Sequence, residues 1–302
     1  MTDVPKCRFC NSGSLSQTIR GDFVYGGTED QHFWECADCQ MIYLSPPFDE
    51  EKEDEFYKKE FEKYMSKRAG RDMDWTGPEA HFQSNQREVQ RRMPFLEKYI
   101  KRGDRVLEIG CSSGFMLSAL KEKGLDVYGL DPSGGFVDYV RNKGISIFHK
   151  LDDLIKEVKG GFDLIIHYYV FEHIRHPVDF LKQYVLLLKE GGKMIFEVPC
   201  ASDPLVELYQ IPAFDKFYWS VVHHWYFNKA SLPKVFEKAK VQYALFPEQR
   251  YDLSNHMVWM SEGKPGGFGK YSEVFGSQLD KSYKEQLKKN WLCDTIIAVV
   301  KK

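Results

Sequence analysis

The sequence predicts an α/β fold built on a doubly wound, mainly parallel sheet, and three observations support this prediction. An apolar run that ends in an acid and a glycine, VLEIG at 106–110, precedes a turn of small residues and a helical pattern. A second apolar run ends at Asp131, 21 positions after Gly110. Apolar runs and helical patterns then continue to alternate, as they do in a parallel sheet covered by helices.

The turn after the first run has the composition of a cofactor site. Gly110 can adopt a left-handed backbone, and Gly114 removes a side chain where a helix meets a strand. Asp131 has the spacing at which a carboxylate reaches a ribose diol. Ser112 and Ser113 stand where dinucleotide binders carry further glycines. These residues favour a nucleoside cofactor without a pyrophosphate.

The segment resembles motif I and the following acidic loop of class I S-adenosylmethionine-dependent methyltransferases, with Ser112 in place of the commoner glycine. The resemblance implies a Rossmann-like doubly wound sheet of seven strands and S-adenosylmethionine as the cofactor. A different Rossmann-like nucleotide binder is the alternative. The residues expected around the cofactor are Glu108, Gly110, Cys111, Ser112, Gly114, Asp131, Pro132, Asp152 and His167.

Composition and charge restrict the class of protein. The chain has 302 residues, 43% of them hydrophobic and 28% charged, as is usual for a globular protein. It contains no apolar run long enough to span a membrane and no export signal at its N-terminus, which predicts a cytoplasmic protein. The formal net charge of −2 gives no general attraction to nucleic acid or to anionic membranes.

Two CxxC pairs near the N-terminus predict a metal site. Four thiolates at this spacing, separated by 25 residues, can surround one ion as a tetrahedron. Zinc is the expected ion, and iron is the alternative in the same geometry. Aromatic and apolar residues between the pairs indicate the short strands of a zinc ribbon over residues 1–48. The predicted ligands are Cys7, Cys10, Cys36 and Cys39, whereas Cys111, Cys200 and Cys293 are expected to be buried.

Some ribosomal-RNA methyltransferases also carry an N-terminal zinc module, so an RNA substrate is an alternative. Residues 1–45 contain three basic and six acidic side chains, and thiolates add more negative charge. The negative charge of this module disfavours contacts with RNA phosphates.

Residues 49–102 predict a helical connector. Acids come before bases, and Phe56, Tyr57, Phe61 and Tyr64 recur at near-helical spacing. The pattern resembles the segment before motif I in bacterial methyltransferases, where a helix or its tyrosine closes over the cofactor; the alternative is a helix that only covers the core. A second helix is expected over 79–102, kinked at Pro94.

The methyltransferase domain is predicted over residues 103–302. Further strands are expected at 145–148, 162–170, 191–199, 241–247 and 294–302, with a helix at 179–189. An apolar pattern at 255–260 also predicts a strand, which leads into a glycine-rich loop where Asn255 and His256 are weak site candidates.

The segment that begins at Asp163 resembles the motif after the fourth strand of these enzymes and places Glu172 and His173 at the carboxyl edge of the sheet. Tyr168 and Tyr169 stand where DNA adenine methyltransferases carry an Asn or Asp before two prolines, which disfavours that activity. A hydrogen bond inside the core is the alternative role of His173.

An aromatic insertion at about 200–228 is expected to bind the acceptor. His223 begins an HxxYF pattern that resembles bacterial sugar C-methyltransferases, which also start with a cysteine-rich zinc module. Val222 replaces the glutamate common there, and the chain has no room for their extra C-terminal domain. The resemblance implies a nucleotide-linked sugar or glycan as the acceptor and His223 as a proton acceptor. Packing of His223 among aromatic rings, an RNA methyltransferase and a non-catalytic zinc- and cofactor-binding scaffold are the alternatives.

Overall fold

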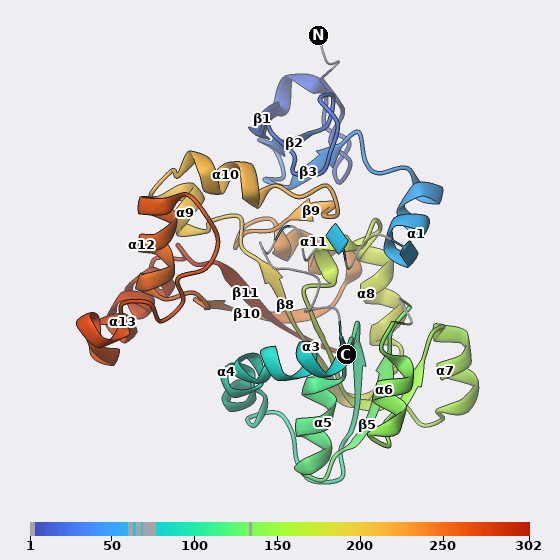
Figure 1. Cartoon of the computed structure of the whole chain (residues 1–302). Helices are drawn as coiled ribbons and strands as arrows, with labels where there is room; N and C mark the ends of the chain where they lie inside the picture. Colours follow the sequence, from blue (N-terminus) through green and yellow to red (C-terminus); the bar gives the residue numbers. More distant parts are fainter. Residues whose placement is uncertain (1–3, 60–62, 65–67, 69–76, 133–134) are drawn as a thin grey trace. The chain divides into compact units, whose positions relative to one another are not determined.

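The computed structural model describes residues 4–59, 63, 64, 68, 77–132 and 135–302, and its elements are labelled in Figure 1. The chain forms two compact units. The first unit contains Met1–Asp49, Phe171–Val178 and Glu197–Ala298, and the second contains Glu50–Val170, Asp179–Phe196 and Val299–Lys302. The boundaries 1–48, 49–102 and 103–302 remain a prediction.

The second unit carries the parallel part of the large sheet. Strand β4 pairs in parallel with β5 and with β7, and β5 pairs in parallel with β6. A helix follows each of these strands, so the predicted alternation of strands and helices is confirmed. The strands are β4 (Arg105–Ile109), β5 (Asp126–Leu130), β6 (Ser146–Phe148) and β7 (Phe162–Tyr168), and the helices are α5 (Phe115–Glu122), α6 (Val137–Asn142), α7 (Leu151–Glu157) and α8 (Pro177–Val185).

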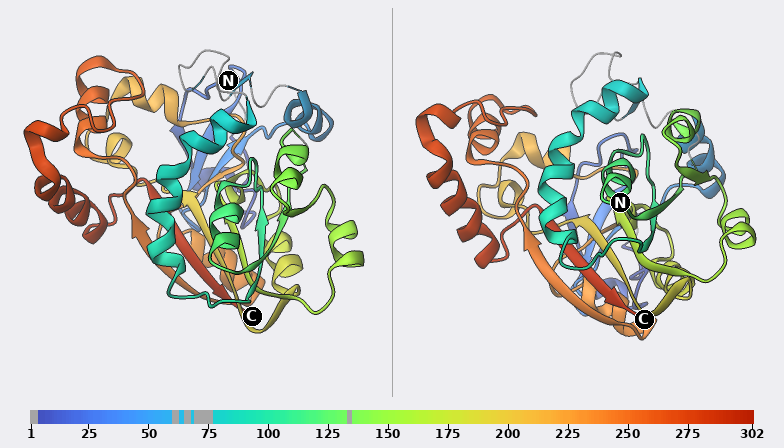
Figure 2. Two further views of the ribbon diagram at one scale, coloured as in Figure 1. Left: turned by 60° about the horizontal axis from the view of Figure 1, so that its bottom comes forward. Right: turned by 90° about the horizontal axis from the view of Figure 1, so that it is seen from below.

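The large sheet has seven strands in the order β10-β11-β8-β7-β4-β5-β6, which confirms the predicted fold class. The remaining strands are β8 (Leu188–Pro199), β10 (Gln242–Glu248) and β11 (Thr295–Lys301). Strands β10 (orange) and β11 (red) lie side by side in Figure 2, although two helices, α12 (Leu253–Glu262) and α13 (Ser272–Lys289), separate them in the sequence. Among the described helices, none combines the length and the apolar composition needed to cross a bilayer.

The prediction of a strand at 255–260 is wrong, because this segment belongs to the helix α12. The Asp252 side chain caps the helix by accepting a hydrogen bond from the backbone N–H of Asn255, and Gly263 ends it with a left-handed φ of 62°. The buried side chains at 254–256, 258 and 259 follow helical spacing. The apolar run therefore belongs to a capped helix, in which Val258 and Trp259 are buried and Met260 is exposed.

The connector contains α1 (Glu50–Lys59), α3 (Pro78–Ser84) and α4 (Gln86–Leu96). The helix predicted over 79–102 is broken at Asn85, whose φ and ψ are −97° and 3°, and Pro94 lies inside α4. The rings of Phe56 and Tyr64 are 5.4 Å apart. Phe61 lies outside the described residues, and the lid remains a prediction.

The first unit contains a second, antiparallel sheet in the order β1-β2-β3-β9. Phe33 on β2 packs edge-on against Tyr226 on β9, with ring centroids 5.0 Å apart, which joins the N-terminal strands to the aromatic insertion. The strands are β1 (Gln17–Gly21), β2 (His32–Cys36), β3 (Ile42–Ser45) and β9 (Trp225–Tyr226), and the helical segments are η1 (Ser14–Ser16), η3 (Phe171–His173), α9 (Pro204–Glu207), α10 (Pro212–Tyr218) and α11 (Leu232–Ala239).

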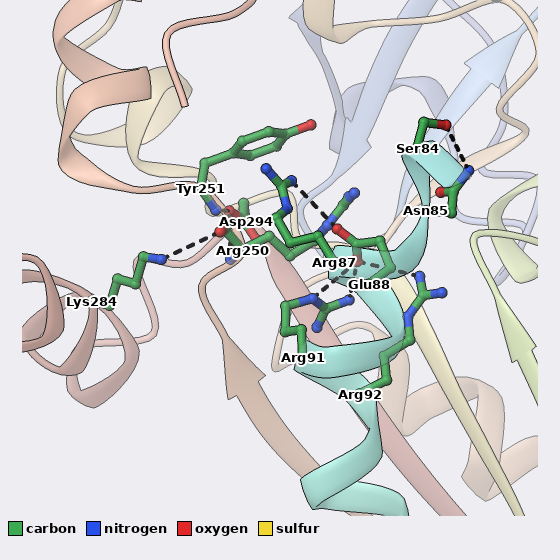
Figure 3. A network of polar contacts seen from close by, with 10 residues as sticks. All are labelled: Ser84, Asn85, Arg87, Glu88, Arg91, Arg92, Arg250, Tyr251, Lys284 and Asp294. Carbon is green, nitrogen blue, oxygen red and sulfur yellow. Dashed lines mark hydrogen bonds and ion pairs between the residues drawn. The ribbon is translucent and has the colours of Figure 1, made fainter. Parts of the chain in front are cut away.

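A buried carboxylate fastens the end of β10 to the start of β11 in the first unit. Asp294 accepts hydrogen bonds from the backbone N–H groups of Arg250 and Tyr251, each at 3.0 Å (Figure 3), and from Gln249 Nε2 at 2.8 Å. Burial raises the pKa of Asp294, and these donors together with the Arg250 charge oppose the rise. The network has a structural role in joining the two strands.

Candidate functional site

The turn between β4 and α5 has three left-handed residues. Gly110, Ser112 and Gly114 have φ values of 69°, 48° and 69°. A Cβ atom on Gly110 would lie 2.7 Å from Val170 Cγ2, so only glycine fits there. Ser112 adopts the backbone conformation for which the commoner glycine is suited, at a cost of roughly 1 kcal/mol. The turn therefore exposes main-chain groups at the carboxyl end of β4.

Asp131, at the end of β5, closes this turn. Its Oδ2 accepts a hydrogen bond of 2.7 Å from the backbone N–H of Ser112, and the residue is buried. Two of the predicted cofactor residues are thus in direct contact. The parallel pairing of β4 with β5 explains this contact, because it brings the carboxyl ends of both strands to one edge.

Glu108 lies buried on β4, just before the turn. Burial raises its pKa to about 8, the Arg92 charge opposes the rise, and the Asp131 charge adds to it. Among the described residues, none donates a hydrogen bond to Glu108 Oε2, although this atom is buried. A buried carboxylate oxygen of this kind is suited to a cationic ligand group.

Arg92 on α4 is a further candidate site residue, which the sequence did not predict. Its guanidinium lies 3.8 Å from the centroid of the Tyr168 ring and 3.7 Å from Glu88 Oε2. Figure 3 shows Glu88 with the neighbouring arginines of the same helix, Arg87 and Arg91, at 3.5 and 2.8 Å. The spacing of four between Glu88 and Arg92 was visible in the sequence, but their burial was not.

His81 on α3 also contacts the turn. Its Nδ1 lies 2.9 Å from Ser113 Oγ, and its ring lies 5.3 Å from that of Phe136. Burial lowers the pKa of His81, while the charge of Asp131 opposes the decrease. The connector thus places an imidazole beside the cofactor turn, a contact that the sequence did not predict.

The other predicted cofactor residues have different surroundings. His167 stacks on Phe196 with centroids 4.4 Å apart and is fully buried, and desolvation lowers its pKa to about 3. His167 is therefore part of the core. Asp152 is exposed in the first turn of α7, Pro132 is exposed, and Cys111 is buried.

The raised pKa of Glu108 predicts that the difference in folding stability between the wild type and the Glu108→Gln variant depends on pH. Because folding favours the protonated carboxyl group, the wild-type chain loses stability as the pH rises from about 4.5 to about 8. The Glu108→Gln variant has no such titration. Thermal denaturation without ligand should show the variant gaining stability relative to the wild type across this range, by at most about 5 kcal/mol. A difference that does not vary with pH would contradict the prediction.

Glu172, His173 and His223 form a second candidate site, within the first unit. One carboxylate oxygen and one imidazole nitrogen from each histidine all lie within 4.8 Å of one another. The two imidazole rings meet edge to face with centroids 4.7 Å apart. The structure therefore brings together the three residues that the sequence suggested for the acceptor.

Two hydrogen bonds hold the histidine cluster in place. His173 donates its Nδ1–H to the backbone oxygen of Val222 at 2.8 Å, and the backbone N–H of His224 donates to the oxygen of Glu172, also at 2.8 Å. Glu172 is 1% exposed, and burial raises its pKa to about 8 against the charge of Arg250. The η3 segment and the turn before β9 therefore form one rigid site.

The four N-terminal cysteines gather as predicted from their spacing. The Sγ atoms of Cys7 and Cys39 are 3.6 Å apart, and those of Cys10 and Cys36 are 3.7 Å apart. A tetrahedral ion with sulfur ligands at about 2.3 Å holds them roughly 3.8 Å apart, so the donor set fits such an ion. The hydrogen bond between the two thiols lowers the pKa of Cys7 to about 5 and raises the pKa of Cys39.

Strand β9 connects the cysteine cluster to the histidine cluster. Ile42 and Tyr43 of β3 are paired with Tyr226 and Trp225 of β9, and the backbone N–H of Leu44 donates to the oxygen of His224 at 3.1 Å. The N-terminal module thus supplies the strand against which the HxxYF segment is held. The sequence links the two features only through their shared resemblance to sugar C-methyltransferases and does not predict this pairing.

Comparison with known proteins identifies the family. Residues 81–243 match the family described as "Methyltransferase domain". The ubiquinone biosynthesis O-methyltransferase of Coxiella burnetii (strain Dugway 5J108-111) is 30% identical over 112 residues, which are 35% of this chain and 48% of that protein. The ribosomal protein L11 methyltransferase of Thermotoga neapolitana is 34% identical over 87 residues, 27% and 33% of the two chains. The chain thus matches half or less of the length of these curated relatives.

A solved structure supports the same fold. The plantazolicin methyltransferase BamL, in complex with a triazolic desmethylPZN analog and SAH, aligns with a TM-score of 0.50 at 14% identity and covers 82% of this chain and 93% of its own. The strand order, the left-handed turn after β4 and the match over more than half of the residues agree with one another. The chain therefore belongs to the methyltransferase-domain family and has the Rossmann-like fold of class I S-adenosylmethionine-dependent methyltransferases.

Proposed function

We propose that the chain transfers the methyl group of S-adenosylmethionine to a hydroxyl group of a small polar acceptor, namely a nucleotide-linked sugar or a glycan. The observation that carries this proposal is the pairing of β3 with β9. The cysteine module and the HxxYF segment are the two features that resemble sugar C-methyltransferases, and they form one sheet. Their joint presence in the first unit supports an acceptor site of that kind.

The second unit supplies the groups for the cofactor. Residues 108–114 would hold the methionine part, with the buried Glu108 carboxylate facing positive charge, and Asp131 would hold the ribose. The left-handed φ angles of Gly110 and Gly114 give the turn the shape that would receive this part of the cofactor. When bound, S-adenosylmethionine supplies a methyl group on a positively charged sulfur.

The histidine cluster would act on the acceptor. The chain passes from Tyr168, the last residue of β7, to Glu172 within four residues, so the cluster follows the carboxyl end of a central strand. There the acceptor hydroxyl gives up its proton while its oxygen forms the new bond to carbon. The carbon–sulfur bond breaks in the same step, and its electron pair stays on sulfur. The proton passes to solvent water, and the cluster lowers the barrier by reducing the cost of its loss.

The four-cysteine site would hold zinc in a structural role. All four positions are filled by protein thiols, and three of these cysteines are buried, so no coordination position is left for a substrate. The bound ion would stabilise the β1-β2-β3 strands, which form a small sheet in a segment too short to have a large core of its own.

Transfer of an isotope-labelled methyl group tests the function. The purified, zinc-loaded chain is incubated with labelled S-adenosylmethionine and panels of nucleotide-linked sugars, glycans and RNA, and products are identified by mass spectrometry. Labelled sugar or glycan is expected. Label that appears only in RNA would replace the proposal with the RNA alternative, and no transfer to any panel would favour the scaffold.

The Asp131→Ala variant tests the cofactor site in the same assay. Loss of a charge-assisted hydrogen bond costs about 1.5–3 kcal/mol, so calorimetry should show S-adenosylmethionine bound about 10- to 150-fold more weakly. Asp153, on α7 and half exposed, provides the matched control, because Asp153→Ala should bind the cofactor like the wild type. Equal affinity in Asp131→Ala and the wild type would contradict the assigned ribose contact.

A further inference from the structure

We propose that Glu172, His173 and His223 bind a divalent transition-metal ion at a site separate from the four cysteines. The donor set is two imidazole nitrogens and one carboxylate oxygen, which suits ions such as Co²⁺, Fe²⁺ and Zn²⁺. The cysteine site offers only sulfur. The two sites therefore differ in the ligands they present and can be distinguished by spectroscopy.

The positions of the donor atoms suit one ion. All three donor atoms lie within 4.8 Å of one another. On a tetrahedral ion with metal–ligand distances of about 2.1 Å, two ligands lie about 3.4 Å apart. Side-chain rotations that bring the donor atoms closer together, by at most about 1.4 Å, would place all three on the ion.

The hydrogen bond of His173 prepares its other nitrogen for a metal. The backbone oxygen of Val222 can only accept, so Nδ1 carries the proton and Nε2 carries the lone pair. Metal-binding histidines almost always donate their second nitrogen to a carbonyl or carboxylate in this way. The bond fixes both the tautomer and the direction of the ring.

The Glu172 carboxylate supplies an independent reason for a cation. Both of its oxygens are buried, and neither accepts a hydrogen bond from another described residue. An ionised carboxylate in such a place is strongly destabilised unless a positive charge compensates it. A bound dication would provide that charge.

The site would also leave room for a ligand. Three protein side chains leave at least one coordination position open on a four- to six-coordinate ion. We assign this open position to an oxygen of the acceptor, an assignment that rests on the proposed function. The ion would then lower the pKa of the acceptor hydroxyl, and the proton would pass to solvent water while both histidines stay bound to the ion.

Cobalt binding to the chain of residues 1–302, loaded with one equivalent of zinc for the four cysteines, tests the site without cofactor or acceptor. Co²⁺ is titrated while absorption is recorded, and bound metal is counted by mass spectrometry after equilibrium dialysis. One Co²⁺ per chain is expected, with visible d–d bands but without the intense near-ultraviolet bands of cobalt–thiolate bonds. Glu172→Gln and His223→Gln should each weaken binding at least 100-fold, whereas His176→Gln, which changes an exposed histidine of the same unit, should not.

The zinc content and the affinity for S-adenosylmethionine show whether each variant is folded. Retention of both in at least one of the two ligand variants, with cobalt binding lost, supports the site. No cobalt bound by the wild type, thiolate bands on binding, or equal binding by wild type and both variants would overturn it. A wild-type chain that binds cobalt here but transfers no methyl group would contradict the proposed function and leave the metal site standing.

Discussion

The Cys36→Ser variant is expected to lose its structural zinc together with the β1-β2-β3-β9 sheet. Cys36 is fully buried at the end of β2, and its sulfur lies 3.7 Å from that of Cys10. Structural zinc sites contribute on the order of 10 kcal/mol to the folding of small modules. Because β9 is held by β3, loss of the sheet should also release the segment that carries His223. Methyl transfer should fall below detection.

Three measurements test whether Cys36→Ser loses its zinc and its sheet. Mass spectrometry should find less than one zinc per chain, tryptophan fluorescence should shift to longer wavelength as Trp34 and Trp225 become exposed, and calorimetry should still detect S-adenosylmethionine. Cofactor binding should persist because Glu108, Ser112 and Asp131 all belong to the second unit.

The Cys293→Ser variant is the matched control for Cys36→Ser. Cys293 is also fully buried in the first unit, and its thiol donates to the oxygen of Thr295, which a serine hydroxyl can also do. It should keep its zinc and its activity. Normal methyl transfer by a zinc-free Cys36→Ser chain would show that the ion does not support the acceptor site.

The cofactor turn could be predicted from the sequence because its requirements are local. Gly110 and Gly114 are needed by the backbone conformation itself, and Asp131 follows from the length of one βαβ unit. The parallel register then brings the ends of β4 and β5 together. The position of His167 could not be predicted in this way. A strand pattern does not show which side of the sheet a side chain faces, and His167 faces the core.

The contributions of Arg92 and His81 could not be predicted, because both depend on how helices pack. The sequence shows a polar helix with paired charges, which usually indicates an exposed surface. Glu88 and Arg92 become buried only when α4 packs against the rest of the second unit. The break at Asn85, which sets the direction of α3 and so places His81 beside Ser113, has no strong sequence signal.

The link between the two clusters was hidden for a related reason. Residues 42–45 and 225–226 are about 180 positions apart, and a strand of two residues gives no periodic pattern. Each half of the site was visible in its own motif, the cysteine pairs and HxxYF. Their pairing is a long-range contact that only the folded chain reveals.

The His223→Ala variant is expected to lower kcat for methyl transfer by about 10²- to 10⁴-fold, the range for loss of assistance to proton transfer. His223 is buried beside His173, and the hydrogen bonds of the backbone at Val222 and His224 place it there. Without its imidazole the acceptor hydroxyl must lose its proton with less help. Initial rates at saturating acceptor and cofactor, with binding of S-adenosylmethionine measured separately, give the comparison.

Separate measurements of kcat and of cofactor affinity distinguish a role of His223 in proton loss from a structural role. The cofactor groups belong to the second unit, so the affinity of His223→Ala for S-adenosylmethionine should equal that of the wild type. His176→Ala, at an exposed position of the same unit, should leave kcat unchanged. If His223→Ala weakened cofactor binding and lowered the melting temperature in proportion to its loss of rate, the imidazole would be a packing element among the aromatic rings. An unchanged kcat would remove His223 from the reaction, because the proposed chemistry requires the acceptor proton to be lost at this cluster.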